Sequence, residues 1–387
     1  MKTHHPLPRI QLHLTHHHLL QHRRLSPSMT RLQPYLRHIH LPSDAAQTTY
    51  PSYCVAAAIQ ARLQRAQLDF KAASSSSSSS PSPPPPALVT FTPTPTYTLG
   101  RRQHSSFSSS FQSKTLPPSL QALTKPLHFA HHPTTTTTAY EPVVLRTSRG
   151  GLTTYHGPGQ LVIWPVLDLK GGGGFHRPYT VRSYASLLQT VTCTILARLW
   201  GLVGTTTCDP GVWLTTAGEV EKEETRKVAA MGVHLRRHVT GLGVALNLST
   251  PVTSSSSSSA NSTTDAEGSN PWLRFVPCGL EGKHVTSVAE ELRLRGGDDE
   301  AGLDLNLDPV RDAGRAVADA WAAEFAARIA RDQTAEKLAV VTVDDGEVRQ
   351  LVADVAGEAK LIEEESRLWP ARPDGQDEPL RHPADIC

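Results

Sequence analysis

Paired cysteines, long apolar runs and a large excess of charge are all lacking in this 387-residue sequence. The five cysteines are scattered along it: Cys54, Cys193, Cys208, Cys278 and Cys387. An odd number without any CxxC spacing suits a reducing compartment better than a disulfide framework. No apolar run approaches the ~20 residues that a membrane helix needs, so we expect no membrane partner. A net charge of +2 gives no electrostatic reason to expect nucleic acid either.

Two cofactor motifs are also incomplete. Gly241, Leu242 and Gly243 form a GxG, but the third glycine of a dinucleotide site and its acidic residue ~20 positions further on are missing. Neither an HExxH motif nor a closely spaced cysteine pair offers ligands to zinc. The sequence therefore predicts neither a nicotinamide cofactor nor a metal site.

The length alone would allow two domains, but tracts of serine, proline and threonine reduce the foldable part to about one. We expect these tracts to be disordered insertions at about 72–86, 103–139 and 251–270, which have little to bury. The sequence predicts one catalytic domain over residues 31–331. Residues 332–387 form a C-terminal tail to which we assign no role.

The N-terminus is basic, and no acidic residue precedes Asp44. This composition is typical of mitochondrial targeting segments. We predict that residues 1–30 are a disordered targeting segment, cleaved before Leu36, and that the mature protein works in the mitochondrial matrix. An incidental basic tail and a histidine-rich metal site are the alternatives.

Hydrophobic periodicity predicts an α/β (α+β) fold with a mixed central sheet flanked by helices. Strands are predicted at 36–41, 87–92, 143–146, 161–169, 211–214, 227–230 and 242–248. Helices are predicted at 50–71, at 179–200, from Ser287, and at 308–329. The helix at 179–200 should end at Gly201. Its expected core face consists of Val181, Tyr184, Leu188, Val191, Ile195 and Leu199.

A glycine-rich loop precedes the strand at 161–169. Residues 149–160 contain four glycines and one proline, together with Arg149, His156 and Gln160. Glycine lets the backbone turn sharply and lets a ligand approach the main chain. The loop could therefore be a binding wall, although a tight turn between two strands explains it equally well.

Cys278 lies between Pro277 and Gly279, a setting that can present a thiol openly. A free thiol with a pKa of ~8.5 is mostly protonated near neutrality, so a nucleophilic cysteine needs a cationic or basic helper. Lys227, at the head of an apolar run, could lower the pKa of the thiol or act as a base. Taken singly, these residues could equally be an inert buried thiol and a surface charge.

Three stretches occur together in one order: the glycine-rich loop, then 227–233 with 241–247, then 275–280 with 285–288. Together they resemble the lipoyl(octanoyl) transferase family over roughly residues 31–330. The resemblance implies a single domain with a biotin/lipoate-ligase-like architecture. It also implies transfer of an octanoyl group from octanoyl-acyl carrier protein to a lysine of lipoyl domains, such as the glycine cleavage H protein. This transfer is the first step of protein lipoylation.

The resemblance carries the catalytic cysteine of the family to Cys278 and its activating lysine to Lys227. It carries the substrate contacts to Arg149, Gly150, Gly151, Leu152, Thr153, Thr154, Tyr155, His156, Ala230, Met231, Gly232, Gly243, Val244 and Ala245. Gln60 matches a glutamine of the comparable helix, whereas Gly241 stands where an aromatic residue or histidine is expected. His156 could be an acid–base group. We favour a positioning role, because the cysteine and lysine already account for the proton transfers.

The implied reaction passes through a cysteine thioester acyl-enzyme and needs neither ATP nor a metal. The acyl donor itself carries phosphopantetheine, and we expect the enzyme to be a monomer. An ATP-dependent lipoate–protein ligase of similar fold is one alternative, but it would not need Cys278 in this setting. A catalytically silent scaffold that binds lipoyl domains is another, but it would need neither Cys278 nor Lys227.

Overall fold

The computed structural model describes residues 35–44, 49–73, 82–106, 118–130, 137–171, 175–215, 225–252, 268–277, 283–296, 313–330 and 338–369. All of them belong to the second of two units into which the chain divides, residues 34–387. The predicted targeting segment, 1–30, lies outside the described residues. No helix among the described residues is long and apolar enough to cross a membrane.

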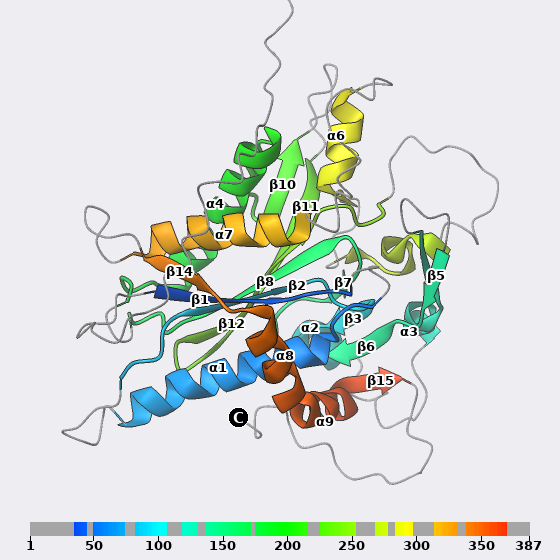
Figure 1. Ribbon diagram of the computed structural model, residues 1–387. Coiled ribbons are helices and arrows are strands. Elements are labelled where there is room, and N and C mark those ends of the chain that lie inside the picture. Colours follow the sequence, from blue (N-terminus) through cyan, green and yellow to red (C-terminus); the bar gives the residue numbers. More distant parts are fainter. Residues whose placement is uncertain are drawn as a thin grey trace, which may run out of the picture. The chain divides into compact units, whose positions relative to one another are not determined.

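A mixed sheet forms the centre of this unit, and its described part has nine strands (Figure 1). Their order is β14-β1-β2-β8-β12-β11-β10-β9, and β13 pairs with β11. The bounds are Tyr35–Leu41 (β1), Ala87–Phe91 (β2), Gln160–Val166 (β8), Gly204–Thr205 (β9), Gly211–Thr215 (β10), Thr225–Arg236 (β11), Val239–Asn247 (β12), His284–Val285 (β13) and Ala339–Thr342 (β14). Strands β14, β1 and β2 run parallel, as do β11 and β13, whereas the other neighbours are antiparallel.

Helices cover both faces of this sheet (Figure 1). One face packs against α4 (Val181–Trp200) and α7 (Ala313–Ile329), and the other against α1 (Tyr53–Ala73), α8 (Asp345–Asp354) and α9 (Ala356–Ser366). Every residue of β2, β8 and β12 is therefore buried, which explains why these strands read as continuous apolar runs. We call the two sides of the sheet the α4 face and the α1 face.

Two smaller sheets and several short helices accompany the central sheet. A second sheet has the order β15-β6-β3-β7, and a third pairs β4 with β5. Their bounds are Thr96–Leu99 (β3), Leu127–Ala130 (β4), Thr137–Tyr140 (β5), Val143–Arg146 (β6), Thr153–His156 (β7) and Arg367–Trp369 (β15). The short helices are Arg101–Ser106 (α2), Pro118–Gln121 (α3), Ala122–Thr124 (η1), Pro271–Arg274 (η3) and Val288–Gly296 (α6).

The predicted fold class, a mixed sheet flanked by helices, is confirmed. Helix α4 ends as expected, with Gly201 in the left-handed region at φ 65°. Its predicted core face is too long, because Val181 and Leu199 are 51% and 36% exposed. These two residues lie in the first and last turns of the helix.

The predicted disordered insertion at 103–139 is partly wrong. Its described part contains α3, η1, β4 and most of β5. Leu120, Leu123, Leu127 and Phe129 are buried there against the aromatic rings of Tyr97 and Tyr155. These four apolar side chains are spaced between the serine and threonine tracts, so low average complexity concealed a segment that can bury surface.

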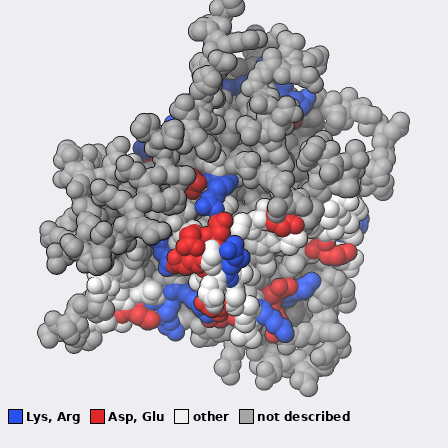
Figure 2. Space-filling view, viewed as in Figure 1, with Lys and Arg blue, Asp and Glu red and all other residues white. Residues whose placement is uncertain are grey.

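Residues 338–369, within the tail to which the sequence assigned no role, complete the unit. Strand β14 extends the central sheet beside β1, α9 packs along α1, and β15 pairs with β6. Acidic and basic side chains lie next to one another on the face shown in Figure 2. Arg62 of α1 pairs with Glu358 of α9 at 2.6 Å. Such exposed pairs stabilise little. The buried side chains of Val348 and Val355 are therefore the stronger attachment.

Truncation of Val348 tests this attachment. Val348 is 1% exposed in the core on the α1 face, so Val348→Ala should lower the free energy of unfolding by about 1–3 kcal/mol. Val341→Ala is the matched control, because Val341 is 47% exposed and a surface change of this kind alters stability by about 0.5 kcal/mol or less. Urea denaturation of both variants measures the difference, and equal effects would contradict the packing.

Candidate active site

A pocket of about 400 Å³, part of it open to solvent, lies on the α1 face of the sheet. It is lined by Tyr53, Arg149, Thr154, His156, Trp164, Ala230, Met231, Gly232, Leu242, Gly243, Val244 and Ala245. The lining therefore comes from α1, the glycine-rich loop with β7, and strands β8, β11 and β12. Segments far apart in the sequence meet here because β8, β12 and β11 are adjacent in the sheet.

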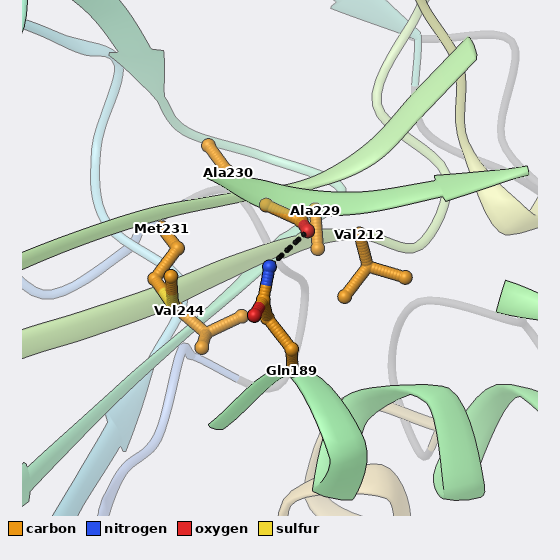
Figure 3. A pocket seen from close by; sticks show the side chains of 7 residues that line it. Gln189, Val212, Ala229, Ala230, Met231 and Val244 are labelled. Atoms are coloured by element: carbon orange, nitrogen blue, oxygen red, sulfur yellow. Dashed lines mark hydrogen bonds between the residues drawn. The ribbon is translucent and has the colours of Figure 1, made fainter. Parts of the chain in front are cut away.

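The floor of the pocket is made of very small residues. In the register of β11 with β12, Ala230 pairs with Ala245 and Gly232 pairs with Gly243. Because side chains alternate along a strand, these four residues face the same side. Met231 and Val244, between them, direct their side chains to the α4 face, where they line a smaller hollow of about 140 Å³ (Figure 3). Met231 therefore presents its backbone, and not its thioether, to the larger pocket.

A β-bulge places Lys227 on the face of the pocket. Val212 pairs with Ala229 but Trp213 pairs with Lys227, so Val228 is an extra residue in β11. Val228 and Ala229 both pack into the core on the α4 face. The alternation slips by one position, and Lys227 emerges on the same side as Ala230. Bulges commonly redirect a side chain beside an active site in this way.

The Lys227 side chain is enclosed. It is 6% exposed, its Nζ donates to the carbonyl oxygen of Pro210 at 3.0 Å, and Nζ lies 4.7 Å from the ring centroid of Trp213. Gly211 leaves the necessary space, since a Cβ there would stand 3.0 Å from Cε of Lys227. The cation–π contact and the carbonyl hold the amine in one position on this side of the sheet.

Arg149 forms part of the pocket wall. A Cβ at Gly232 would stand 3.2 Å from Cδ of Arg149, so the arginine stem lies directly over the floor. Its guanidinium donates to the carbonyl oxygens of Thr98 at 2.5 Å and Leu152 at 2.7 Å. Arg149 thereby ties the glycine-rich loop to β3, and its apolar stem is the part next to the floor.

His156 presents a neutral ring to the pocket. Gln160 must donate through Nε2, because that nitrogen meets the carbonyl oxygen of Tyr155 at 3.2 Å and Oδ1 of Asn247 at 2.9 Å. Oε1 of Gln160 therefore accepts from Nδ1 of His156 at 2.8 Å, which fixes the Nδ1–H tautomer. Burial lowers the pKa of His156 to about 3, with a smaller contribution from Arg149 in the same direction. Nε2 is consequently a hydrogen-bond acceptor near neutrality, which fits the positioning role favoured from the sequence.

The same buried network continues to the strand that carries Lys227. Nδ2 of Asn247 donates to the carbonyl oxygen of Thr286 at 2.9 Å, and the amide of Thr286 donates to the carbonyl oxygen of Lys227 at 2.9 Å. Glu291 accepts from the hydroxyl of Thr286 at 2.6 Å and from the guanidinium of Arg226 at 2.9 and 3.0 Å. The network therefore connects the pocket wall at His156 with Arg226 and Lys227, near the start of β11.

Many, but not all, of the site residues predicted from the sequence line the pocket. Lys227 lies on the same side of the sheet as the pocket but does not line it. Nine of the fourteen predicted substrate contacts do line the pocket: Arg149, Thr154, His156, Ala230, Met231, Gly232, Gly243, Val244 and Ala245. Gly150, Gly151, Leu152, Thr153 and Tyr155 do not line it. Tyr155 packs instead against Tyr97 and Trp272 on the other side of β7. Cys278 lies outside the described residues, one position after Pro277.

Sequence reasoning missed several residues of the site. Tyr53, Trp164 and Leu242 line the pocket, and Gln160 and Asn247 hold His156. Only the last two left a signal, because each is a polar residue at the end of an otherwise apolar strand. Buried polar groups of this kind need partners, which indicates a network.

The comparisons with known proteins agree with this geometry. Residues 133–300 match the family model described as the lipoyl protein ligase A/B catalytic domain. The matched range contains strands β7, β8, β11 and β12 of the pocket, together with Lys227 and Cys278.

Curated relatives narrow the resemblance to octanoyltransferases. The octanoyl-[acyl-carrier-protein]:protein N-octanoyltransferase LIPT2, mitochondrial, of Xenopus tropicalis is 39% identical over 148 residues, which are 38% of this chain and 48% of that protein. The human protein of the same name is 38% identical over 38% of this chain and 51% of that protein. The probable octanoyltransferase of Schizosaccharomyces pombe is 34% identical over 38% and 54%. The resemblance to lipoyl(octanoyl) transferases is thus confirmed, while the chain spans about half the length of the curated relatives it matches.

A solved structure is also similar. The putative lipoate protein ligase from T. acidophilum with bound lipoic acid is 11% identical, with a TM-score of 0.41, over 84% of this chain and 96% of that chain.

The buried His156 predicts a loss of stability in acid. Because its pKa in the fold is about 3, the unfolded chain, with a histidine pKa of ~6.5, takes up a proton first as the pH falls. This one group should make the protein about 2 kcal/mol less stable at pH 5 than at pH 7. Urea denaturation at both pH values measures the effect, and His156→Gln should show a pH dependence smaller by that amount. An unchanged pH dependence in the variant would refute the buried neutral ring.

Proposed function

We propose that this protein transfers an octanoyl group from octanoyl-acyl carrier protein to a lysine amine of lipoyl domains. The observation that carries the proposal is the pocket itself, whose floor is alanine and glycine, with the buried Lys227 three residues before Ala230 on the same strand and the same side of the sheet. An unbranched acyl chain fits a narrow slot lined by small residues, and each buried CH₂ contributes about 0.8 kcal/mol. In this proposal the acyl carbonyl reacts at the end of the slot nearer to Lys227.

Lys227 and Cys278 divide the work in this proposal. Cys278 is the nucleophile, carried over from the family motif, and Lys227 is the base that takes the thiol proton. Lysines shift their pKa readily when they are buried, and this is how they come to serve as general bases. Backbone N–H groups of the glycine-rich loops are candidates for stabilising the oxyanion.

Two acyl transfers make up the reaction. In the first, the Cys278 sulfur bonds to the acyl carbon, the bond from that carbon to the pantetheine sulfur breaks, and Lys227 passes the proton to the departing thiolate. In the second, the neutral lysine amine of the acceptor bonds to the same carbon and the bond to Cys278 breaks. Lys227 now carries the proton from that nitrogen to the Cys278 thiolate. Thioester exchange is near-neutral and amide formation is downhill, so neither step requires ATP or a metal.

The remaining parts of the proposal concern partners and location. The donor would be octanoyl-acyl carrier protein, and the acceptors would be lipoyl domains such as the glycine cleavage H protein. The basic, acid-poor N-terminus and the mitochondrial names of several relatives support a location in the mitochondrial matrix.

Intact mass after incubation with octanoyl-acyl carrier protein, with ATP omitted, tests the proposal. We expect an octanoyl adduct on the wild-type protein, no adduct on Cys278→Ala, and an adduct on Cys208→Ala. Cys208 is the matched control because its thiol is exposed and could be acylated non-specifically. Lys227→Ala should slow both half-reactions by roughly 10²–10⁴, the usual contribution of a general base.

The opposite results point to defined alternatives. Acceptor modification only with ATP and free octanoic or lipoic acid would establish the ligase instead. If neither condition gave acylation, the result would favour a catalytically silent scaffold that binds lipoyl domains. Normal turnover of Lys227→Ala would remove this lysine from the mechanism.

A further inference from the structure

Leu242 occupies a strained position at the end of the pocket. Its φ is 60°, in the left-handed region, which is unfavourable for a leucine. Its N–H donates to Oε1 of Gln60 at 2.6 Å, and Gln60 is itself buried on α1. Strained residues held by surrounding structure gather at functional sites, and here an observed outlier lies in the wall of the proposed acyl slot.

The left-handed backbone changes the side of the sheet toward which Leu242 directs its side chain. Val244 and Leu246 on β12 pack on the α4 face, and regular alternation would send Leu242 to that face too. Leu242 instead packs with the core on the α1 face and lines the pocket. The left-handed residue thus transfers one large side chain into a slot whose floor is otherwise alanine and glycine.

The position of Leu242 is the end of the slot furthest from Lys227. The strand register runs from Lys227 through the pair of Ala230 with Ala245 to the pair of Gly232 with Gly243, and Leu242 follows. Beyond it the space above the sheet is filled. Nε2 of Gln64 donates to the carbonyl oxygen of Thr240 at 3.1 Å, and a Cβ at Gly241 would lie 2.4 Å from that Nε2.

We propose that Leu242, held by Gln60, closes the acyl slot and sets the longest straight acyl chain that the enzyme accepts. This inference rests on the proposed function, because it assigns the chain-length limit of the same site. A chain that enters the slot from the end formed by Ala230 and Ala245 meets the Leu242 side chain first and the Gln60 and Gln64 amides next. Further methylenes would have to displace the leucine or cover amide groups that are already hydrogen-bonded, so affinity stops rising with chain length.

Shortening Leu242 therefore lengthens the accepted chain. In Leu242→Ala, two additional methylenes of a decanoyl group would be buried where the leucine stood. The ratio of kcat/KM for decanoyl over octanoyl transfer should rise about tenfold relative to wild type, as expected from burying two methylenes. A purely structural role for Leu242 would lower both rates together and leave the ratio unchanged.

The experiment measures transfer from hexanoyl-, octanoyl-, decanoyl- and dodecanoyl-acyl carrier protein by wild type, Leu242→Ala and Leu246→Ala. Leu246 is the matched control, since it is a fully buried leucine of the same strand on the other face. Leu242→Val is the milder variant, with a smaller shift in the same direction, if the alanine variant fails to fold. Gln60→Leu, which releases the Leu242 amide, should also broaden the chain-length profile.

Calorimetric measurement of the binding of free octanoate and decanoate separates this inference from the proposed function. Tighter decanoate binding by Leu242→Ala, but not by Leu246→Ala, would support the end wall even if transfer is absent in every protein. A wild-type enzyme that transfers octanoyl while Leu242→Ala keeps the wild-type chain-length and binding profiles would overturn it.

Discussion

The site depends on one break in the alternation of strand β11. With regular alternation, Lys227 would share a face with Ala229 and lie in the core against α4, away from the pocket. The extra residue Val228 reverses this arrangement. Val228 and Ala229 point into the core on the α4 face, whereas Lys227 and the small floor residues point to the α1 face. The chain can therefore place a reactive amine and a smooth apolar slot on one continuous strand. A bulge loses one ladder position, and the burial of Val228 and Ala229 compensates for it.

A bulged strand end needs external support, and the buried polar network supplies it. Strand β13 pairs with the first residues of β11, Thr286 bonds the Lys227 carbonyl, and Glu291 neutralises Arg226. Such a buried ion pair is weak evidence for net stability, but loss of one partner leaves an uncompensated charge that costs about 3–5 kcal/mol. The arrangement favours a single position of this strand end over alternatives. Through Asn247 and Gln160, the same network fixes the tautomer of His156, so the two walls of the pocket are set together.

The sequence predicted the regular parts of this structure and missed the irregular ones. Strand and helix periods identified most elements around the pocket, and the family resemblance pointed to residues 230–232 and 243–245. The bulge at Val228 left no trace, because Val228 and Ala229 are apolar whichever face they take. The left-handed Leu242 was equally hidden, since glycine is the residue that signals such a backbone. Residues 338–369 were left unassigned because the partners of their strands and helices, β1, α1 and β6, are distant in sequence.

The glycine at position 241, where the family pattern led us to expect an aromatic residue or histidine, is connected to the strain at Leu242. A Cβ at position 241 would stand 2.4 Å from Nε2 of Gln64 and 3.2 Å from Nε2 of Gln60. Without a side chain there, α1 can lie close enough for Gln60 to reach the Leu242 amide. A bulky residue would push both glutamines away, leave that amide without its present partner, and allow β12 to relax to regular alternation. The departure at Gly241 is thus compatible with an intact pocket, because α1 fills the vacated space with two amide groups that hold the end of the slot.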